Sequence, residues 1–166
     1  MPLVAFDALP DAARVWVFSA AAPVTGAAAE SLLAMVDGHL RAWRAHGVPL
    51  VCARDWRDDR FLAIGVDEAA TGASGCSIDA LFHALRDAER EVGTSLVDGT
   101  RLFWRDADGV VQVTDRPGFR AAAASGAVGA DTRVFDTTVE SVGGWRTHFE
   151  KPARASWQSR LLPVGA

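Results

Sequence analysis

Apolar and polar positions in the first part of the chain predict a strand followed by a helix. The run of β-forming residues at 14–19 is typical of a strand. Apolar positions three and four residues apart then predict a helix that begins after Thr25 and ends after His46. Gly47 and Pro49 follow, and both residue types end helices. The apolar positions of this helix are Leu32, Leu33, Val36, Leu40 and Trp43.

The next stretch has the pattern of a hairpin and a second helix. Residues 50–56 and 61–66 have the composition of strands, and the polar run 57–60 predicts a tight connection between them. After a glycine-rich loop, apolar positions on one face predict a helix over 78–92, with Gly93 as its terminating residue. The apolar positions of this helix are Ile78, Leu81, Phe82, Leu85 and Val92.

A second hairpin and a less regular extension complete the pattern. Strands at 101–105 and 110–114 flank the turn sequence 106–109. The remainder, 117–166, is expected to pack back on the sheet as a C-terminal extension. Within it the pattern predicts a helix at 117–125, a strand at 131–135, helical spacing over 139–149 and a closing turn at 156–161.

This element order predicts an α+β fold. It fits a ferredoxin-like (split βαβ) antiparallel sheet with two helices on one face and one extra strand. Because no internal repeat or linker interrupts the pattern, we expect a single domain over 1–166.

Composition narrows the class of protein. Hydrophobic residues make up 49% and charged residues 23% of the 166 residues, as in globular domains. The formal net charge is −4 and no basic block stands out, so we expect no nucleic-acid partner. No apolar stretch approaches the ~20 residues that span a bilayer, and the N-terminus lacks the basic region of a signal peptide. We therefore expect a cytosolic protein with no membrane partner.

The segment 71–79 is the most distinctive candidate for chemistry. Cys76 lies where a helix is predicted to begin, and a thiolate at a helix N-terminus can have a pKa below ~8.5 and act as a nucleophile. If Ser74 caps the helix, Cys76 lies in its first turn. If Ser77 caps it, Cys76 precedes the helix and packs against Leu81. We favour Ser77 as the cap and Cys76 as a packing residue.

Carboxylates surround this segment. Asp67 and Glu68 close the third strand and could act as a general base for Cys76, or bind a divalent cation together with Asp79. The favoured interpretation is an exposed strand end. The backbone amides of the loop could also bind an anion or nucleotide. Its candidate residues are Ser74, Gly75, Ser77 and Asp79. A tight strand-to-helix connection is favoured over that site.

Trp157 and Arg160, near the C-terminus, form another candidate binding site. Tryptophan and arginine are typical anchors of protein interfaces. The favoured alternative is that Trp157 belongs to the core. No arrangement of cysteine and histidine suggests a metal site, and no known cofactor motif is present.

Several motifs together carry a resemblance over most of the chain. They lie at 9–10, 14–17, 43–47, 60–61, 67–68, 73–79, 131–135 and 150–157. In these motifs the chain resembles a family of small bacterial proteins of uncharacterised function, with Ser-Gly-Cys-Ser-Ile-Asp at 74–79 as the most specific element. The resemblance implies a shared fold unit and a candidate site at this element.

Members of that family often carry the automatic label "ABC transporter ATPase". The residues here do not support it, because the only lysine, Lys151, is followed by Pro152 and no Walker A loop is present. The family pattern often has a histidine after the Ser-Trp pair and a phenylalanine after the next arginine. This chain has Gln158 and Leu161 there.

The leading functional hypothesis is a non-catalytic domain that binds a small ligand or a protein partner, and a homodimer is one form it could take. It has no expected cofactor. One alternative is a thiol-dependent enzyme or redox-active protein that uses Cys76. A weaker alternative is nucleotide or anion binding at 71–79.

Overall fold

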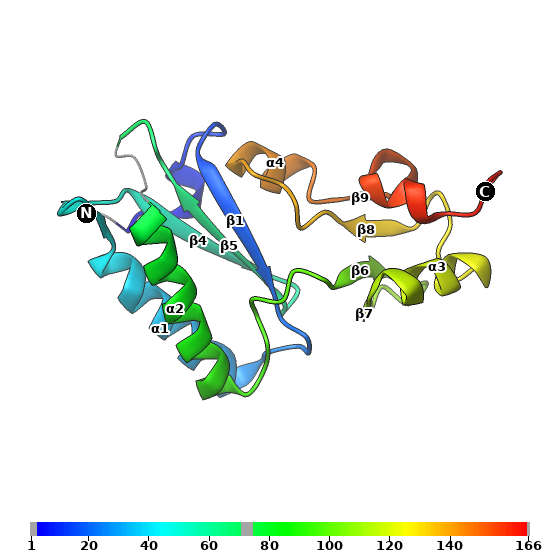
Figure 1. Ribbon diagram of the computed structural model, residues 1–166, viewed down its shortest axis with the longest axis horizontal. Coiled ribbons are helices and arrows are strands. Elements are labelled where there is room, and N and C mark those ends of the chain that lie inside the picture. The colour runs from blue at the N-terminus through cyan, green and yellow to red at the C-terminus, as the bar shows by residue number, and fades with distance from the viewer. Residues whose placement is uncertain (1–2, 71–74, 166) are drawn as a thin grey trace. The chain divides into compact units, whose positions relative to one another are not determined.

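The computed structural model describes residues 3–70 and 75–165, except for the side chain of Cys76. The chain divides into two compact units. Unit 1 consists of Met1–Asp98 and Val139–Arg146, and unit 2 of Gly99–Thr138 and Thr147–Ala166 (Figure 1).

A three-stranded antiparallel sheet forms the centre of unit 1. Strand β5 (Phe61–Val66) lies between β1 (Arg14–Ser19) and β4 (Cys52–Arg57). The predicted hairpin is confirmed, because β4 and β5 pair from Arg57–Phe61 to Cys52–Val66. Asp58 and Asp59 between them have φ of 53° and 54°, the conformation of the two-residue turns that suit twisted hairpins.

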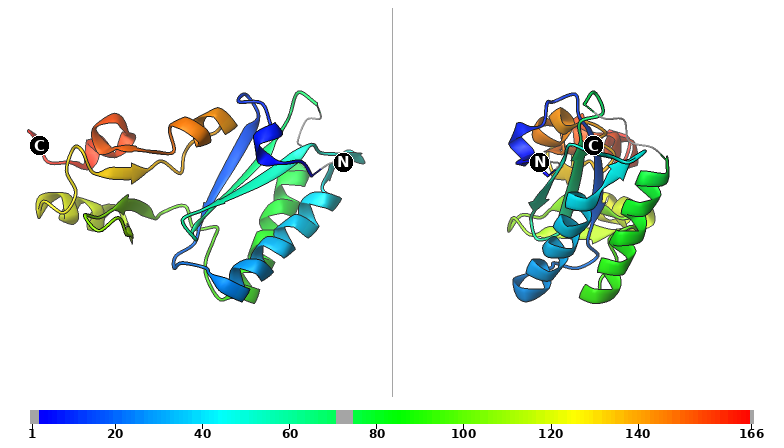
Figure 2. Two further views of the ribbon diagram at one scale, coloured as in Figure 1. Left: turned by 180° about the vertical axis from the view of Figure 1, so that it is seen from behind. Right: turned by 90° about the vertical axis from the view of Figure 1, so that its left-hand side faces the viewer.

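Two helices cover one face of this sheet. Helices α1 (Gly26–Ala42) and α2 (Gly75–Val92) lie side by side against it (Figures 1 and 2). Since side chains alternate along a strand, every second residue of β5 points towards these helices. The core between them includes Leu32, Val36 and Leu40 of α1, Leu62, Ile64 and Val66 of β5, and Leu81, Leu85 and Ala88 of α2.

Residues distant in sequence cover the other face. A Cβ atom on Gly65 would lie 2.5 Å from Leu9 Cδ1 and 3.2 Å from Val142 Cγ2. Val142 begins helix α4 (Val142–Thr147), and Leu9 follows the short 3-10 helix η1 (Phe6–Ala8). Glycine is thus required in the middle of β5 because two segments approach its backbone closely.

Helix α4 is tied to strand β4 by a polar network. Trp145 Nε1 donates to Asp55 Oδ2 at 2.8 Å, and Arg57 Nε donates to the same carboxylate oxygen at 3.0 Å. The Arg57 guanidinium lies 4.4 Å from the centroid of the Trp145 ring. These contacts give a fully buried tryptophan an acceptor and a cation partner.

The first helix ends earlier than the sequence pattern predicts. Helix α1 stops at Ala42, and Trp43 leaves the helix with an extended backbone. A small hairpin follows, formed by β2 (Arg44–Ala45) and β3 (Val48–Pro49). His46 and Gly47 between them have φ of 51° and 80°. The predicted end at His46 was wrong because this pair forms a turn.

Unit 2 contains a four-stranded antiparallel sheet in the order β7-β6-β8-β9. Its strands are β6 (Leu102–Arg105), β7 (Val111–Thr114), β8 (Arg133–Phe135) and β9 (Glu150–Pro152). Helix α3 (Arg116–Ala124) and the 3-10 helices η2 (Ala153–Ala155) and η3 (Trp157–Leu161) complete it. The apolar core of unit 2 includes Leu102, Trp104, Phe119, Val128, Val134 and Leu161.

The α+β class is confirmed, whereas the ferredoxin-like topology is not. The order β1-β5-β4 agrees with a split βαβ arrangement. The fourth strand of that arrangement, predicted at 101–105, instead pairs with β7 and β8 in the sheet of unit 2. That the whole chain folds as a single domain stays a prediction. Within the described residues, no helix has both the length and the apolar character needed to cross a bilayer.

Replacement of Gly65 by alanine should destabilise unit 1. The added methyl group would overlap the buried Leu9 side chain, so we expect a loss of about 1–3 kcal/mol in the free energy of unfolding. The matched control is Gly38→Ala in α1, where a new Cβ meets nothing within 4 Å. It should stabilise the protein by up to ~1 kcal/mol. Urea denaturation compares the two, and equal effects would contradict this account of Gly65.

Candidate functional site

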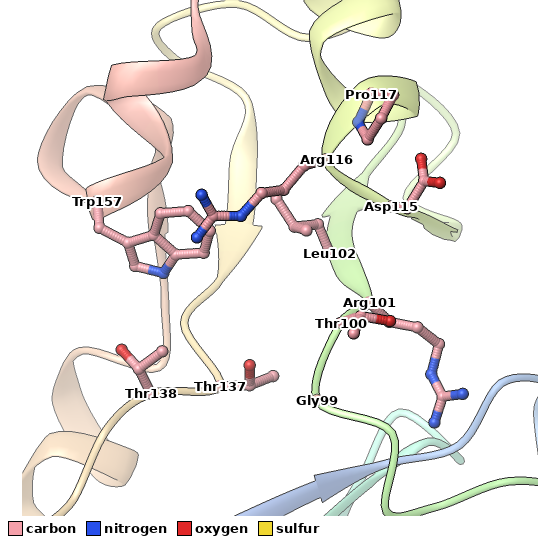
Figure 3. A pocket seen from close by; sticks show the side chains of 10 residues that line it. All are labelled: Gly99, Thr100, Arg101, Leu102, Asp115, Arg116, Pro117, Thr137, Thr138 and Trp157. Carbon is pink, nitrogen blue, oxygen red and sulfur yellow. The ribbon is translucent and has the colours of Figure 1, made fainter.

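A cavity of about 470 Å³ lies within unit 2. Four segments line it: the approach to β6, the start of α3, the loop after β8 and the start of η3 (Figure 3). The lining residues are Gly99, Thr100, Arg101, Leu102, Asp115, Arg116, Pro117, Thr137, Thr138 and Trp157. This volume falls in the range of about 300–1,000 Å³ that is usual for ligand pockets.

Local capping fixes the wall formed by α3. Asp115 is the N-cap residue, and its Oδ1 accepts a hydrogen bond from Gly118 N at 2.8 Å. Pro117 lies in the first turn, where its missing N–H costs nothing. A Cβ on Gly118 would lie 1.8 Å from Thr114 Oγ1, so the helix start packs tightly against β7. The carboxylate of Asp115 is thereby committed to the helix.

A buried glutamine holds the segment that carries Trp157. Gln158 is 1% exposed, and its Nε2 donates to Phe135 O in β8 at 3.0 Å. Ser156 Oγ, also buried, donates to Gln158 Oε1. These bonds connect the segment that carries Trp157 to strand β8.

The indole of Trp157 carries the unusual feature of the cavity. Its Nε1 is buried and finds no hydrogen-bond acceptor among the described residues. Figure 3 shows this nitrogen on the ring edge that faces Thr137 and Thr138. The Arg116 guanidinium lies 5.3 Å from the ring centroid. A buried donor without an acceptor costs ~1–3 kcal/mol.

In two other tryptophans the indole N–H donates a hydrogen bond to an acceptor of the protein. Trp43 Nε1 donates to Ser77 O at 2.7 Å, and Trp145 Nε1 donates to Asp55. Both acceptors belong to the protein. Trp157 differs from these two tryptophans because its N–H has no acceptor among the described residues.

The loop after β8 is held by Asp136. Its Oδ1 accepts from Thr138 N at 3.0 Å and also from Thr138 Oγ1. Its Oδ2 accepts from Lys151 Nζ at 3.2 Å, and both side chains are largely buried. Because Thr138 donates its hydroxyl proton to Asp136, the oxygen that it presents elsewhere can only accept.

An ion-pair cluster joins strands β6, β8 and β9 of unit 2. Glu150 of β9 accepts from Arg105 Nε and Nη2 at 2.9 and 3.2 Å, and Arg133 Nε lies 3.7 Å from its Oε1. Burial alone would raise the pKa of Glu150. The Arg105 hydrogen bonds and charge, assisted by Arg133, outweigh it and hold that pKa below its ordinary value.

Of the three acidic candidates around 71–79, Asp67 has a local structural role. Asp67 Oδ1 accepts from Ala69 N and Ala70 N at 3.1 and 3.3 Å, which stabilises the turn after β5. Glu68 and Asp79 are exposed. Among the described residues, no group of three or more His, Cys, Asp or Glu side chains could hold a metal ion.

The predicted cap at Ser77 was wrong. Helix α2 includes Gly75, so Ser77 lies inside the helix, where it is buried and its carbonyl accepts from Trp43. Gly75 is exposed. Ser74 and the rest of 71–74 lie outside the described residues, as does the Cys76 side chain. The other thiol, Cys52, is fully buried, and burial raises its pKa to about 12.

Of the two C-terminal candidates, Trp157, for which core packing was favoured, packs against the apolar core of unit 2 and also lines the cavity. Arg160 of the same 3-10 helix is exposed at the surface. Sequence reasoning missed Arg116 and the threonines Thr137 and Thr138. The Asp-Arg-Pro-Gly sequence at 115–118 could have indicated Arg116, since this sequence is typical of a helix start. A side chain at a helix start can reach a neighbouring element.

Comparison with known proteins identifies no relative of the chain. No protein-family model matches it, and no curated protein or solved structure is significantly similar to it.

Replacement of Glu150 by glutamine should lower the stability of unit 2 in a pH-dependent way. A carboxylate whose pKa is depressed by folding contributes stability above its unfolded pKa, and that stability is lost as the pH falls through the folded value. We expect a loss of ~1 kcal/mol at pH 7 that shrinks below pH ~4. Native-state hydrogen exchange of the β6 and β8 amides measures it.

The control for this prediction is Asp87→Asn. Asp87 pairs with Arg90 on the exposed surface of α2, where such pairs contribute little. Its replacement should leave unit 2 unchanged. An equal loss for Glu150→Gln at pH 7 and pH 3 would show that packing, and not charge, holds the cluster together.

Proposed function

We propose that this chain is a non-catalytic binding protein that takes a small ligand in the cavity of unit 2. One observation carries the proposal: unit 2 contains a cavity of about 470 Å³, a usual volume for a ligand pocket, and its lining includes the Trp157 ring with the Arg116 guanidinium 5.3 Å from the ring centroid.

The lining supports binding without turnover. Its polar side chains include Asp115 and Thr138, which are engaged in capping α3 and in holding Asp136. The ten lining residues of unit 2 contain no histidine or cysteine. They therefore contain no Cys–His or Ser–His pair, the arrangement in which a histidine base activates a nucleophile.

The cellular setting is proposed on sequence grounds. A cytosolic location, a bacterial source and a homodimeric form are compatible with the composition and with the family resemblance at 74–79. Under this proposal the Ser-Gly-Cys-Ser-Ile-Asp element belongs to the fold unit and not to the ligand site.

A thiol-dependent function is the second candidate. Its support is the position of Cys76, which follows Gly75 within α2 instead of preceding the helix. Near a helix N-terminus the helix dipole stabilises a thiolate, which would activate Cys76. The two candidates make separate predictions.

Ligand binding is tested by a small-molecule library screened by NMR on the 15N-labelled protein. We expect binders to shift the Trp157 indole N–H signal, identified by its loss in Trp157→Phe, together with amides at 99–102 and 137–138. The indole signals of Trp43 and Trp145, which have protein acceptors, serve as internal controls. A library that shifts none of the cavity signals would contradict the proposal.

Thiol activation is tested by alkylation with iodoacetamide at pH 7. If Cys76 is activated, it should react faster than a model thiol of pKa ~8.5, while Cys52 stays unmodified because it is buried with a pKa of about 12. Peptide mass spectrometry resolves the two sites, and labelling in urea confirms that both can react. A Cys76 rate at or below that of the model thiol would remove this second candidate.

A further inference from the structure

We propose that strand β7 is an interaction surface for a second copy of this chain, which adds its own β7 antiparallel along the free edge of the unit 2 sheet. The two sheets then join across a two-fold axis at Gln112. The proposal does not rest on ligand binding, because none of the β7 residues 111–114 lines the cavity.

The outer edge of β7 carries unpaired backbone groups. Within the described residues, β7 pairs with β6 alone, at one end of the order β7-β6-β8-β9. Asp106 N donates to Val110 O, and hydrogen-bonded pairs alternate with non-hydrogen-bonded pairs along an antiparallel ladder. The N–H and C=O groups of Val111 and Val113 therefore point away from β6. No hydrogen bond in the described part of the chain uses them.

The other edge strands of the two larger sheets are covered or carry residues that oppose pairing. The N-terminal segment bridges to Cys52 of β4, and Val15 N of β1 donates to Glu140 O. Strand β9 has the sequence Glu-Lys-Pro, and charged residues and proline are typical protection of an edge. The sequence Val-Val-Gln-Val-Thr at 110–114 has neither. Strand β7 is thus the edge suited to pair with another strand.

This edge is complementary to itself. When two copies lie antiparallel with Gln112 opposite its own counterpart, Val111 of each copy lies opposite Val113 of the other. Every N–H of one outer edge then meets a C=O of the other. Val110, which is 55% exposed, lies opposite Thr114 of the second copy. Because pairs of β-branched side chains stabilise adjoining strands, the same patch serves both subunits, as a two-fold interface requires.

The charges at the two ends of β7 fit the antiparallel direction. The turn before β7 carries Asp108, which is exposed. After β7, the exposed arginines Arg116 and Arg120 outnumber Asp115. Antiparallel pairing brings the acidic turn of one copy towards the arginines of the other, whereas parallel pairing would bring like charges together. Charge therefore favours the same direction as the backbone groups.

The first test is sedimentation equilibrium of the full chain from about 10 μM to 1 mM, since a contact between short edge strands is small and dissociates on dilution. We expect the average mass to rise from one chain towards two. Val113→Pro removes an outward N–H and keeps the bonds to β6, so dimerisation should weaken at least ~tenfold. The matched control, Ala107→Pro, lies where a turn favours proline and should dimerise like the parent chain.

The second test locates the two-fold axis by cross-linking. At position 112 a residue lies opposite its own counterpart, with Cα atoms ~4.5 Å apart, within the ~4.4–6.8 Å that a disulfide needs. Gln112→Cys in a Cys76→Ser background should therefore give a disulfide-linked dimer on mild oxidation. Asp108→Cys is the control, because this exposed position lies roughly 25 Å from its counterpart and should not cross-link.

Each contrary outcome overturns the proposal. A chain that stays monomeric at the highest concentration leaves an extended segment of another protein as the occupant of the β7 edge. Equal dimerisation of Val113→Pro and the parent chain places the dimer contact elsewhere. If circular dichroism shows that Val113→Pro is unfolded, the cross-linking decides, and equal yields from Gln112→Cys and Asp108→Cys contradict the proposal. None of these outcomes affects ligand binding, which is followed separately by the Trp157 indole signal.

Discussion

Burial of β5 on both faces is the constraint on which unit 1 depends. All six residues of Phe61–Val66 are buried, and β1 and β4 occupy both of its edges. Helices α1 and α2 cover one face with neighbouring parts of the chain. The opposite face needs a second cover, which comes from the N-terminal segment around Leu9 and from α4, whose Val142 approaches Gly65. Residues 139–146 therefore belong to unit 1, although they follow the first part of unit 2 in the sequence.

Arginine against an aromatic ring recurs in both units, with different consequences. Arg57 lies over Trp145 in unit 1, and that contact is closed by the carboxylate of Asp55, which accepts from both side chains. Arg116 lies over Trp157 in unit 2, but the carboxylate nearby in sequence, Asp115, is used to cap α3. Among the described residues, the indole N–H of the second pair thus has no acceptor of the kind that completes the first.

Local sequence patterns predicted most of the helices and strands, because these depend on residue spacing and turn residues within one segment. The strands at 14–19 and 61–66 and the helix ended by Gly93 follow directly from residue spacing and turn residues. The partner of the strand at 101–105 could not be predicted, since alternation shows that a strand has a buried face but not which sheet covers it. Trp157, which lines the cavity, could be named as a candidate from its residue type. Its neighbour Arg116 was not, because their contact joins positions far apart in sequence.

The interleaving of the two units also sets an order of events during synthesis. The last lining residue, Trp157, comes after the excursion of the chain through 139–146, so the cavity is complete only once that excursion has been made. The residues that complete the cover of β5 are therefore synthesised before the last residue that lines the cavity.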